Sequence, residues 1–202
     1  MKKRDNTNQH LTKEIYKGNF KAGEIELLEM EIAFQNAFTT LYNDHVLFPN
    51  GQKGQYLRLT WNMPVGAIAL PILENGDVCL VRNFRHPIRK WSIEIPRGFG
   101  KHGESPLDTA VRELREETGL EAKEMLSLGF VTPDTGVLAT RAELFLARDC
   151  RRMTSVERSK EAIKEILVKP YQQVVQMAIK GEIEDGYTIA ALFRVQHSLN
   201  QS

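Results

Sequence analysis

Three glutamates in one short stretch of the chain have the residue type and spacing that metal chemistry needs. Glu113, Glu116 and Glu117 stand at i, i+3 and i+4, so a helix would bring their carboxylates into one small volume. Like charges at this spacing repel one another, and a bound divalent cation would remove that repulsion. Carboxylate oxygens suit Mg²⁺ or Mn²⁺, which also bind substrate phosphates. The alternative is a solvent-exposed helix face on which Arg112 and Arg115 neutralise the acids.

The helix that would carry these glutamates is specified at both ends. Ser105 is a favourable N-cap residue, Pro106 suits the first turn, and Asp108 can complete a capping box. Gly119 lies where a left-handed residue commonly ends a helix. The sequence therefore predicts a helix over residues 106–118. Apolar residues at helical spacing are expected to form its buried stripe: Leu107, Ala110, Val111 and Leu114.

A glycine-rich segment before this helix offers a different interpretation. Residues 98–103 read Gly-Phe-Gly-Lys-His-Gly, which is the G-x-G-x-x-G pattern of dinucleotide-binding sites. In that pattern the last glycine packs the helix against the sheet, whereas here the helix begins only after Glu104. No obvious series of parallel strands accompanies it, so the dinucleotide interpretation is not favoured. A P-loop is excluded because Glu104 and Ser105 follow the glycine instead of Lys and Ser or Thr.

The rest of the chain must position these residues, and strands predominate in it. Helices alternate with the strands irregularly, which is typical of an α+β fold. The expected strands cover residues 38–48, 55–61, 66–73, 78–82, 91–95, 125–131, 142–147 and 163–168. Two further helices are expected over residues 170–179 and 186–198. We expect a small β-rich N-terminal subdomain over residues 1–61 and the main domain over residues 62–202.

Composition limits the class of protein. The chain has 202 residues, of which 42% are apolar and 26% charged, as in an ordinary globular domain. The net charge of +1 gives no reason to expect a nucleic-acid partner. No segment has the ~20 apolar residues of a membrane span, and no signal peptide is recognisable. Cys79 and Cys150 fit no metal spacing and are expected to be free thiols, which predicts a cytoplasmic protein.

Taken with its flanking loop, the glutamate helix resembles a known family motif. Residues 98–120 are similar to the Nudix box, G-x5-E-x7-R-E-U-x-E-E-x-G-U, where U is a bulky aliphatic residue. All nine constrained positions match: Gly98, Glu104, Arg112, Glu113, Leu114, Glu116, Glu117, Gly119 and Leu120. Nine fixed positions are highly specific, so the resemblance favours metal binding over a solvent-exposed face. It implies the α+β Nudix fold, a mixed β-sheet sandwiched between helices, and hydrolysis of a nucleoside diphosphate linked to another group.

The resemblance also implies roles within the motif. Glu113 and Glu117 are the expected metal ligands. Glu116 is expected to be a further ligand or a catalytic residue just outside the ligand shell of the metal. Arg112 is expected to orient the glutamates through ion pairs, and the backbone carbonyl of Arg97 to be a further ligand. The expected cofactor is Mg²⁺, for which Mn²⁺ could substitute. Such cations neutralise pyrophosphate oxygens and help to generate hydroxide.

Outside the box, the chain resembles the branch that hydrolyses ADP-ribose and other nucleoside diphosphate sugars. Residues 82–87 are similar to its R-Q-Y-R-x-P segment, which implies that Arg85 contacts a phosphate or a ribose; the alternative is an ordinary surface arginine. Glu94 lies in an E-x-P-x-G segment and is an expected substrate contact or support for the metal site, or simply an acid at a strand end. Arg97 occupies the position in that segment where alanine is usual.

The catalytic base of this branch is a glutamate in a D-E-x-I-E segment. Residues 160–165 read Lys-Glu-Ala-Ile-Lys-Glu, so Glu161 is the candidate that would deprotonate a metal-bound water. It lacks the preceding acid, and Glu157 and Glu165 remain alternatives. Glu161 could also be a solvated loop residue.

The predicted function is Mg²⁺-dependent hydrolysis of ADP-ribose or a related nucleoside diphosphate sugar to a nucleoside monophosphate and a sugar phosphate. Pro133 falls slightly earlier after the box than the proline of that branch, which leaves sugars other than ribose open. The resemblance also implies a homodimer in which the N-terminal subdomain crosses onto the partner. The alternatives are hydrolysis of another nucleotide, such as NADH or a dinucleoside polyphosphate, and a non-catalytic module that senses a nucleotide sugar.

Overall fold

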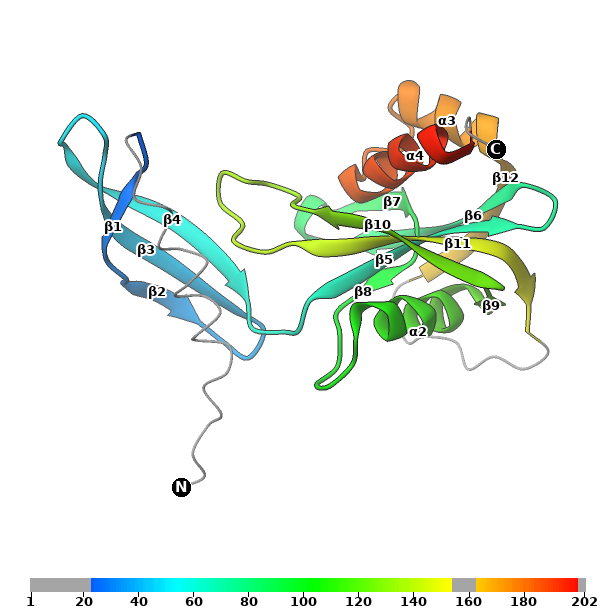
Figure 1. Ribbon diagram of the computed structural model, residues 1–202, viewed down its shortest axis with the longest axis horizontal. Coiled ribbons are helices and arrows are strands. Elements are labelled where there is room, and N and C mark those ends of the chain that lie inside the picture. The colour runs from blue at the N-terminus through cyan, green and yellow to red at the C-terminus, as the bar shows by residue number, and fades with distance from the viewer. Residues whose placement is uncertain (1–22, 154–162, 200–202) are drawn as a thin grey trace. The chain divides into compact units, whose positions relative to one another are not determined.

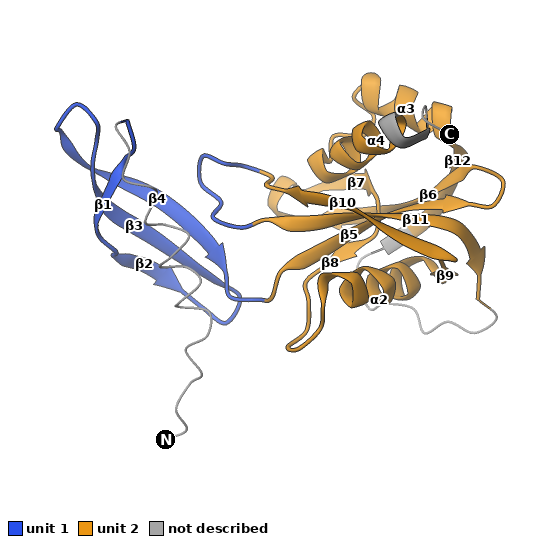
Figure 2. Cartoon of the chain, viewed as in Figure 1, with its two compact units in different colours: residues 1–63, 134–140 blue, residues 64–133, 141–202 orange. Residues whose placement is uncertain are grey.

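Two compact units make up the described part of the protein. The computed structural model describes residues 23–153 and 163–199. Figure 1 labels the helices and strands, and Figure 2 distinguishes the two units. Unit 1 contains residues 1–63 and 134–140, and unit 2 contains residues 64–133 and 141–202. Unit 1 is therefore built from two separate pieces of the sequence.

Unit 1 is a four-stranded antiparallel sheet. Its strands are β1 (Glu26–Glu29), β2 (Ile32–Gln35), β3 (Thr39–Leu47) and β4 (Lys53–Trp61). The central strand β3 pairs with β1 and β2 and also with β4. The segment 134–140 joins this unit through Leu59 of β4, whose N–H donates to the carbonyl of Val137 at 2.8 Å and whose carbonyl accepts from the N–H of Ala139 at 2.9 Å.

Unit 2 is built on an eight-stranded mixed sheet. Five strands run in the order β10-β11-β5-β6-β12, and β7, β8 and β9 pair with β6, β5 and β11 respectively. The pairing of β11 with β5 is parallel, and the other pairings are antiparallel. The elements are β5 (Gly66–Leu73), β6 (Asp77–Arg85), a 3-10 helix η1 (His86–Ile88), β7 (Lys90–Glu94), β8 (Arg97–Gly98), β9 (Leu120–Glu121), β10 (Glu124–Val131), β11 (Ala142–Arg152) and β12 (Ile163–Pro170).

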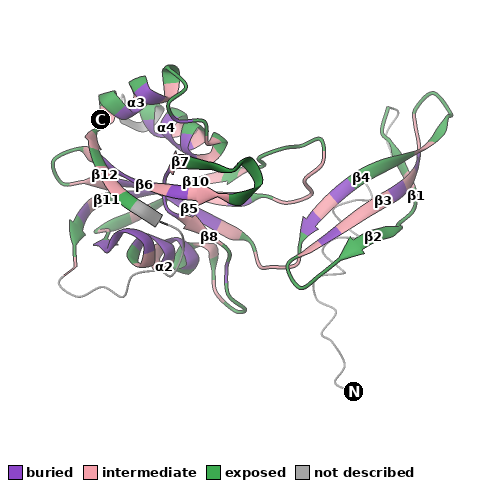
Figure 3. Cartoon of the chain, turned by 180° about the vertical axis from the view of Figure 1, so that it is seen from behind, coloured by how far each residue is buried: buried purple, intermediate pink, exposed green. Residues whose placement is uncertain are grey.

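Three helices cover the two faces of this sheet. Helix α2 (Pro106–Thr118) lies on one face, and α3 (Tyr171–Ile179) and α4 (Gly186–Leu199) lie on the other, as Figure 1 shows. Each face has its own apolar core: Leu114 of α2 belongs to one, and Val174 of α3 and Val195 of α4 belong to the other. Figure 3 shows buried residues concentrated on α2 and on the central strand β5.

The architecture confirms the predicted α+β fold, a mixed sheet sandwiched between helices. The predicted helix over residues 106–118 matches α2 at both ends. Within the described residues, the structure contains no helix with the length and hydropathy of a transmembrane span.

Candidate metal and phosphate site

The ends of α2 are fixed by the interactions that its sequence predicts. The hydroxyl of Ser105 accepts from the backbone N–H of Asp108 at 3.1 Å, and the carboxylate of Asp108 accepts from the backbone N–H of Ser105 at 3.4 Å. Gly119 ends the helix with φ +70°, and its N–H donates to the carbonyl of Arg115. These contacts place the glutamates of the helix at fixed positions against the sheet.

The buried stripe of α2 differs from the predicted one. Leu107 is 43% exposed, so its inclusion in the stripe was wrong. The buried positions include Ala110, Glu113, Leu114 and Glu117, which follow the i, i+3, i+4, i+7 spacing of one helix face. Two carboxylates therefore occupy positions at which the helical pattern would place apolar side chains. A buried carboxylate is costly unless a cation balances its charge.

Arg112 supplies part of that positive charge and ties the preceding loop to the helix. Its Nε and Nη2 donate to the two carboxylate oxygens of Glu104 at 2.9 and 3.0 Å, and its Nη1 donates to Glu113 at 2.6 Å. Nη1 also lies 3.3 Å from Glu116, and Nη2 donates to the carbonyl of Phe99 at 2.9 Å. The hydrogen bond from Arg112 and that from the backbone of Lys101 lower the pKa of Glu104 to about 2. Arg112 thus fixes Glu113 while leaving Glu117 to other partners.

Gly98 of β8 lies directly against the carboxylate of Glu113. A Cβ atom at this position would overlap Oε1 and Cδ of that glutamate. The absence of a side chain therefore allows the β8 backbone to approach Glu113. Because of this close approach, the β8 backbone around Arg97 and the carboxylates of α2 lie in the same region.

Arg85, Glu94 and Arg97 form a second charged group. Glu94 is 1% exposed, and it accepts hydrogen bonds from Nε of Arg85 at 2.9 and 3.0 Å and from Nη2 of Arg97 at 3.0 Å. Burial alone would raise the pKa of Glu94, but the hydrogen bond from Arg85 and the charges of both arginines outweigh it and lower the pKa. Burial alone would lower the pKa of Arg85, but its hydrogen bond to Glu94 and the charge of Glu94 raise it, with a smaller contribution from the charge of Glu117.

Asp185 extends this group to the start of α4, and the sequence analysis missed it. Its carboxylate lies 3.5 Å from Nη2 of Arg97 and accepts from the backbone N–H of Thr188 at 2.9 Å. The hydroxyl of Thr188 in turn accepts from the backbone N–H of Ile95 at 3.1 Å. An Asp just before a predicted helix at Gly186 is a recognisable N-cap signal. Its contact with Arg97 is long-range, and no local pattern in the sequence indicates it.

The remaining candidates lie elsewhere or outside the described residues. Glu161 and Glu157 fall in the segment that the structure does not describe. Glu165 is in β12 and forms an ion pair with Nε of Arg82 at 2.5 Å. The backbone of Arg97 pairs with Ile68 of β5 in the short strand β8. The structure thus brings the box residues together, and it brings Arg85 and Glu94 together.

The oxygen donors of this site fit a hard divalent cation whose coordination shell is completed by the substrate. Among the described residues, no three Asp, Glu, His or Cys side chains are arranged to hold a metal by themselves. Arg112 donates a hydrogen bond to one oxygen of Glu113 and to one oxygen of Glu116. Mg²⁺ characteristically uses one or two carboxylates together with waters and substrate phosphates. Two buried carboxylates one helical turn apart, Glu113 and Glu117, meet that requirement.

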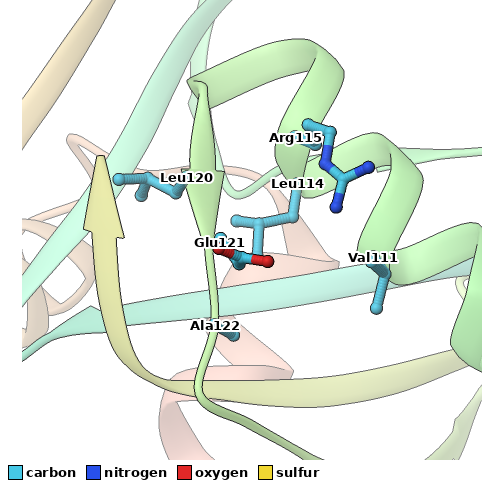
Figure 4. A pocket seen from close by; sticks show the side chains of 6 residues that line it. All are labelled: Val111, Leu114, Arg115, Leu120, Glu121 and Ala122. Atoms are coloured by element: carbon cyan, nitrogen blue, oxygen red, sulfur yellow. The ribbon is translucent and has the colours of Figure 1, made fainter. Parts of the chain in front are cut away.

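A small hollow on α2 is separate from these carboxylates. Figure 4 shows the six residues that line it: Val111, Leu114, Arg115, Leu120, Glu121 and Ala122. Its volume of about 80 Å³ is well below the several hundred Å³ of a typical small-molecule site. We therefore assign no nucleotide to it.

The amino-acid sequence of the chain is similar to those of known proteins. Residues 63–154 match the family model described as the NUDIX domain. The chain is 27% identical over 178 residues to an ADP-ribose pyrophosphatase of Bacillus subtilis (strain 168), a match that covers 88% of this chain and 94% of the relative. It is 26% identical over 177 residues to a methanol dehydrogenase activator of Bacillus methanolicus, with coverage of 87% and 95%.

A solved structure shares the fold. The crystal structure of an ADP compounds hydrolase matches with a TM-score of 0.76 at 19% sequence identity. The match covers 90% of this chain and 97% of that chain. Both units of the described fold are therefore included in the likeness.

Proposed function

Because the chain belongs to the Nudix hydrolase superfamily and is a Nudix pyrophosphohydrolase, we propose that it cleaves the pyrophosphate bond of ADP-ribose or a related nucleoside diphosphate sugar. The products are a nucleoside monophosphate and a sugar phosphate. The observation that carries this proposal is the buried stripe of α2, in which Glu113 and Glu117 replace apolar residues. The similarity to ADP-ribose pyrophosphatase over most of both chains supports the choice of substrate.

Nudix hydrolases generally use divalent cations, and we propose Mg²⁺ here. Glu113 and Glu117 would hold it, with Glu116 at the edge of the site and the backbone carbonyl of Arg97 as a further donor. When bound, the cation neutralises pyrophosphate oxygens and lowers the pKa of water. Arg112 keeps Glu113 in place from the side of the loop, so the carboxylate needs little reorganisation when a substrate binds.

Arg85 is the proposed contact for the substrate phosphates. Its guanidinium can bind an anion in bidentate fashion. Glu94 holds Arg85 through both carboxylate oxygens in the absence of substrate, so Arg85 must exchange this pairing for a phosphate when a substrate binds. The side chain of Arg85 is 29% exposed, which leaves it accessible to a ligand.

Glu161 remains the proposed general base, which would take a proton from the attacking water. The described alternative, Glu165, is less favourable for that role. It pairs with Arg82, and successive side chains of a strand point to opposite faces. Arg82 and Arg85 are three residues apart in β6, so Glu165 lies on the face opposite to Arg85.

We also propose that the active protein is a cytoplasmic homodimer formed through unit 1. Phe34 and Leu59 both lie opposite Leu41 in the sheet register, and Leu57 and Trp61 flank Leu59 at alternate positions. All five side chains therefore share one face of the sheet. Phe34 and Leu57 are each 53% exposed. An exposed apolar face of this kind is typical of a protein–protein interface.

A substrate panel tests the proposed function. ADP-ribose, ADP-glucose, GDP-mannose, UDP-glucose, NADH and diadenosine polyphosphates would each be incubated with Mg²⁺ or with EDTA, and the phosphorylated products identified. We expect EDTA-sensitive release of AMP and ribose phosphate from ADP-ribose. Turnover of another nucleotide in place of ADP-ribose would assign the specificity of the enzyme to that nucleotide. Tight binding of a nucleotide sugar without turnover would indicate a sensor.

A matched pair of variants assigns any turnover to this site. Glu117→Gln removes a charge from the proposed metal site and should lower kcat/KM by about a hundredfold or more. Glu121→Gln changes an exposed glutamate of β9 and should leave kcat/KM within about twofold of the wild-type value. Equal activity of the wild-type and Glu117→Gln proteins would refute the assignment.

A further inference from the structure

Glu94 is buried between two arginines, and the two differ in how they are held. Its side chain is 2% exposed, and a buried carboxylate requires a counter-ion. Arg85 reaches both of its oxygens, whereas Arg97 donates through Nε and Nη2 to Oε2, at 3.1 and 3.0 Å. The carboxylate is therefore shared between one arginine from β6 and one from β8.

Arg97 has anchors that do not depend on Arg85. Its Nη2 also lies 3.5 Å from Asp185, which caps α4, and its guanidinium carbon lies 5.0 Å from the centre of the Tyr187 ring. Arg97 can therefore stay beside Glu94 when Arg85 moves.

This difference matters when a diphosphate binds. A phosphate that attracts Arg85 competes directly with Glu94 for the same guanidinium. If Glu94 lost its counter-ion, a buried charge would remain unbalanced, and substrate binding would bear that cost. A second arginine that stays in place reduces the cost.

We propose that Arg97 is a positioning residue that keeps the Glu94 carboxylate paired while Arg85 turns to a phosphate of the substrate. This inference rests on the proposed function, because it takes Arg85 as the phosphate contact. It assigns the Arg97 side chain a role in substrate affinity that is separate from its backbone carbonyl. Arg97 does not itself contact the substrate in this arrangement.

The test measures the affinity for inorganic pyrophosphate with Mg²⁺ by calorimetry, together with kcat and KM for the best substrate of the panel. Arg97→Ala removes the side chain and leaves the carbonyl. It should raise both the pyrophosphate Kd and KM about tenfold while kcat stays within about twofold. Arg97→Lys keeps a cation beside Glu94, so its pyrophosphate Kd and its KM should each stay within about threefold of the wild-type values.

The decisive comparison repeats Arg97→Ala in a variant whose residue 94 carries no charge. In a Glu94→Gln background, Arg97→Ala should no longer weaken pyrophosphate binding, because no buried charge depends on Arg97. An equal loss of affinity in both backgrounds would show that Arg97 contacts the phosphate directly, and would overturn the proposal. An unchanged Kd for Arg97→Ala in the wild-type background would overturn it as well.

Controls separate this inference from folding and from the proposed function. Arg148→Ala removes a surface arginine that pairs with Glu124 at 3.6 Å, and its Kd should equal that of wild type. Thermal unfolding checks each variant, and Arg97→Gln replaces Arg97→Ala if the alanine variant does not fold. Turnover by the wild-type protein tests the proposed function, whereas ratios of pyrophosphate Kd test the inference. A wild-type protein that binds no pyrophosphate would overturn the inference.

Discussion

Arg112 and Glu104 show how a single ion pair can organise the loop that precedes a helix. Glu104 accepts hydrogen bonds from two nitrogens of Arg112, from the hydroxyl of Thr109 at 3.0 Å and from the backbone N–H of Lys101 at 2.9 Å. The same arginine extends to Glu113. The loop is therefore fixed relative to the proposed metal site by charge-assisted hydrogen bonds, which are stronger than neutral ones.

At the residue scale, the pKa of Glu104 leads to a prediction about pH. Its value of about 2 lies below the ordinary value of 4.5, so the folded state favours the ionised form. This contribution to stability is complete above pH 4.5 and is lost as the pH falls towards 2. Glu104→Gln should therefore lower Tm by a few degrees at pH 7, and the difference from wild type should shrink between pH 4.5 and 2.

Thermal unfolding across this pH range measures the effect. Glu124→Gln is the control, because this exposed glutamate pairs only loosely with Arg148, at 3.6 Å. Its Tm should follow that of wild type throughout. A difference between wild type and Glu104→Gln that stayed constant down to pH 2 would contradict the assignment of the stabilisation to the ionised Glu104.

At the scale of elements, β8 and α2 depend on the absence of a side chain at Gly98. Gly98→Ala would place a Cβ against the Glu113 carboxylate, which must then move. We expect kcat/KM to fall by more than about tenfold, and we expect half-maximal activity to require a higher Mg²⁺ concentration than in the wild-type protein. The measurement is activity as a function of Mg²⁺ concentration.

Gly186→Ala is the matched control for this substitution. A Cβ at Gly186 would meet no neighbouring atom, so activity and its Mg²⁺ dependence should equal those of wild type. Secondary structure by circular dichroism should be preserved in both variants. If Gly98→Ala responded to Mg²⁺ as wild type does, the close approach of β8 to Glu113 would have no bearing on metal binding.

Local signals allowed the sequence to predict α2 closely, and contacts between distant segments explain most of what it missed. The Ser105 cap and the Gly119 terminus are encoded within a few residues, so the ends of the helix are correct. The buried stripe was wrong at Leu107 because periodicity assigns apolar residues to the buried face, whereas this face buries two glutamates. The contact of Arg97 with Asp185 joins positions far apart in the chain, and strand β8 has only two residues and no periodicity.

At the scale of the whole molecule, the apolar face of unit 1 predicts the oligomeric state. The wild-type protein should have twice the mass of one chain in light scattering coupled to size exclusion. The double variant Phe34→Glu/Leu57→Glu places two charges on that face and should give a folded monomer with much reduced activity.

Phe193→Glu provides the comparison for the dimer prediction. Phe193 is 76% exposed on α4 in unit 2, so this variant adds a charge at an exposed apolar residue outside unit 1. It should keep the mass of the wild-type protein. A wild-type protein that runs as a monomer at micromolar concentration would refute the proposed dimer.

The pairing of segment 134–140 with β4 has a consequence for how this protein can be recombined. A chimera in which only residues 1–63 were exchanged would retain residues 134–140 of the original chain. These residues belong to the same unit, although they lie between β10 and β11 in the sequence. The exchanged module would then lack the backbone partners that Val137 and Ala139 give to Leu59. Chimeras of this protein should therefore tolerate an exchange of the N-terminal unit only when both coding segments are transplanted together.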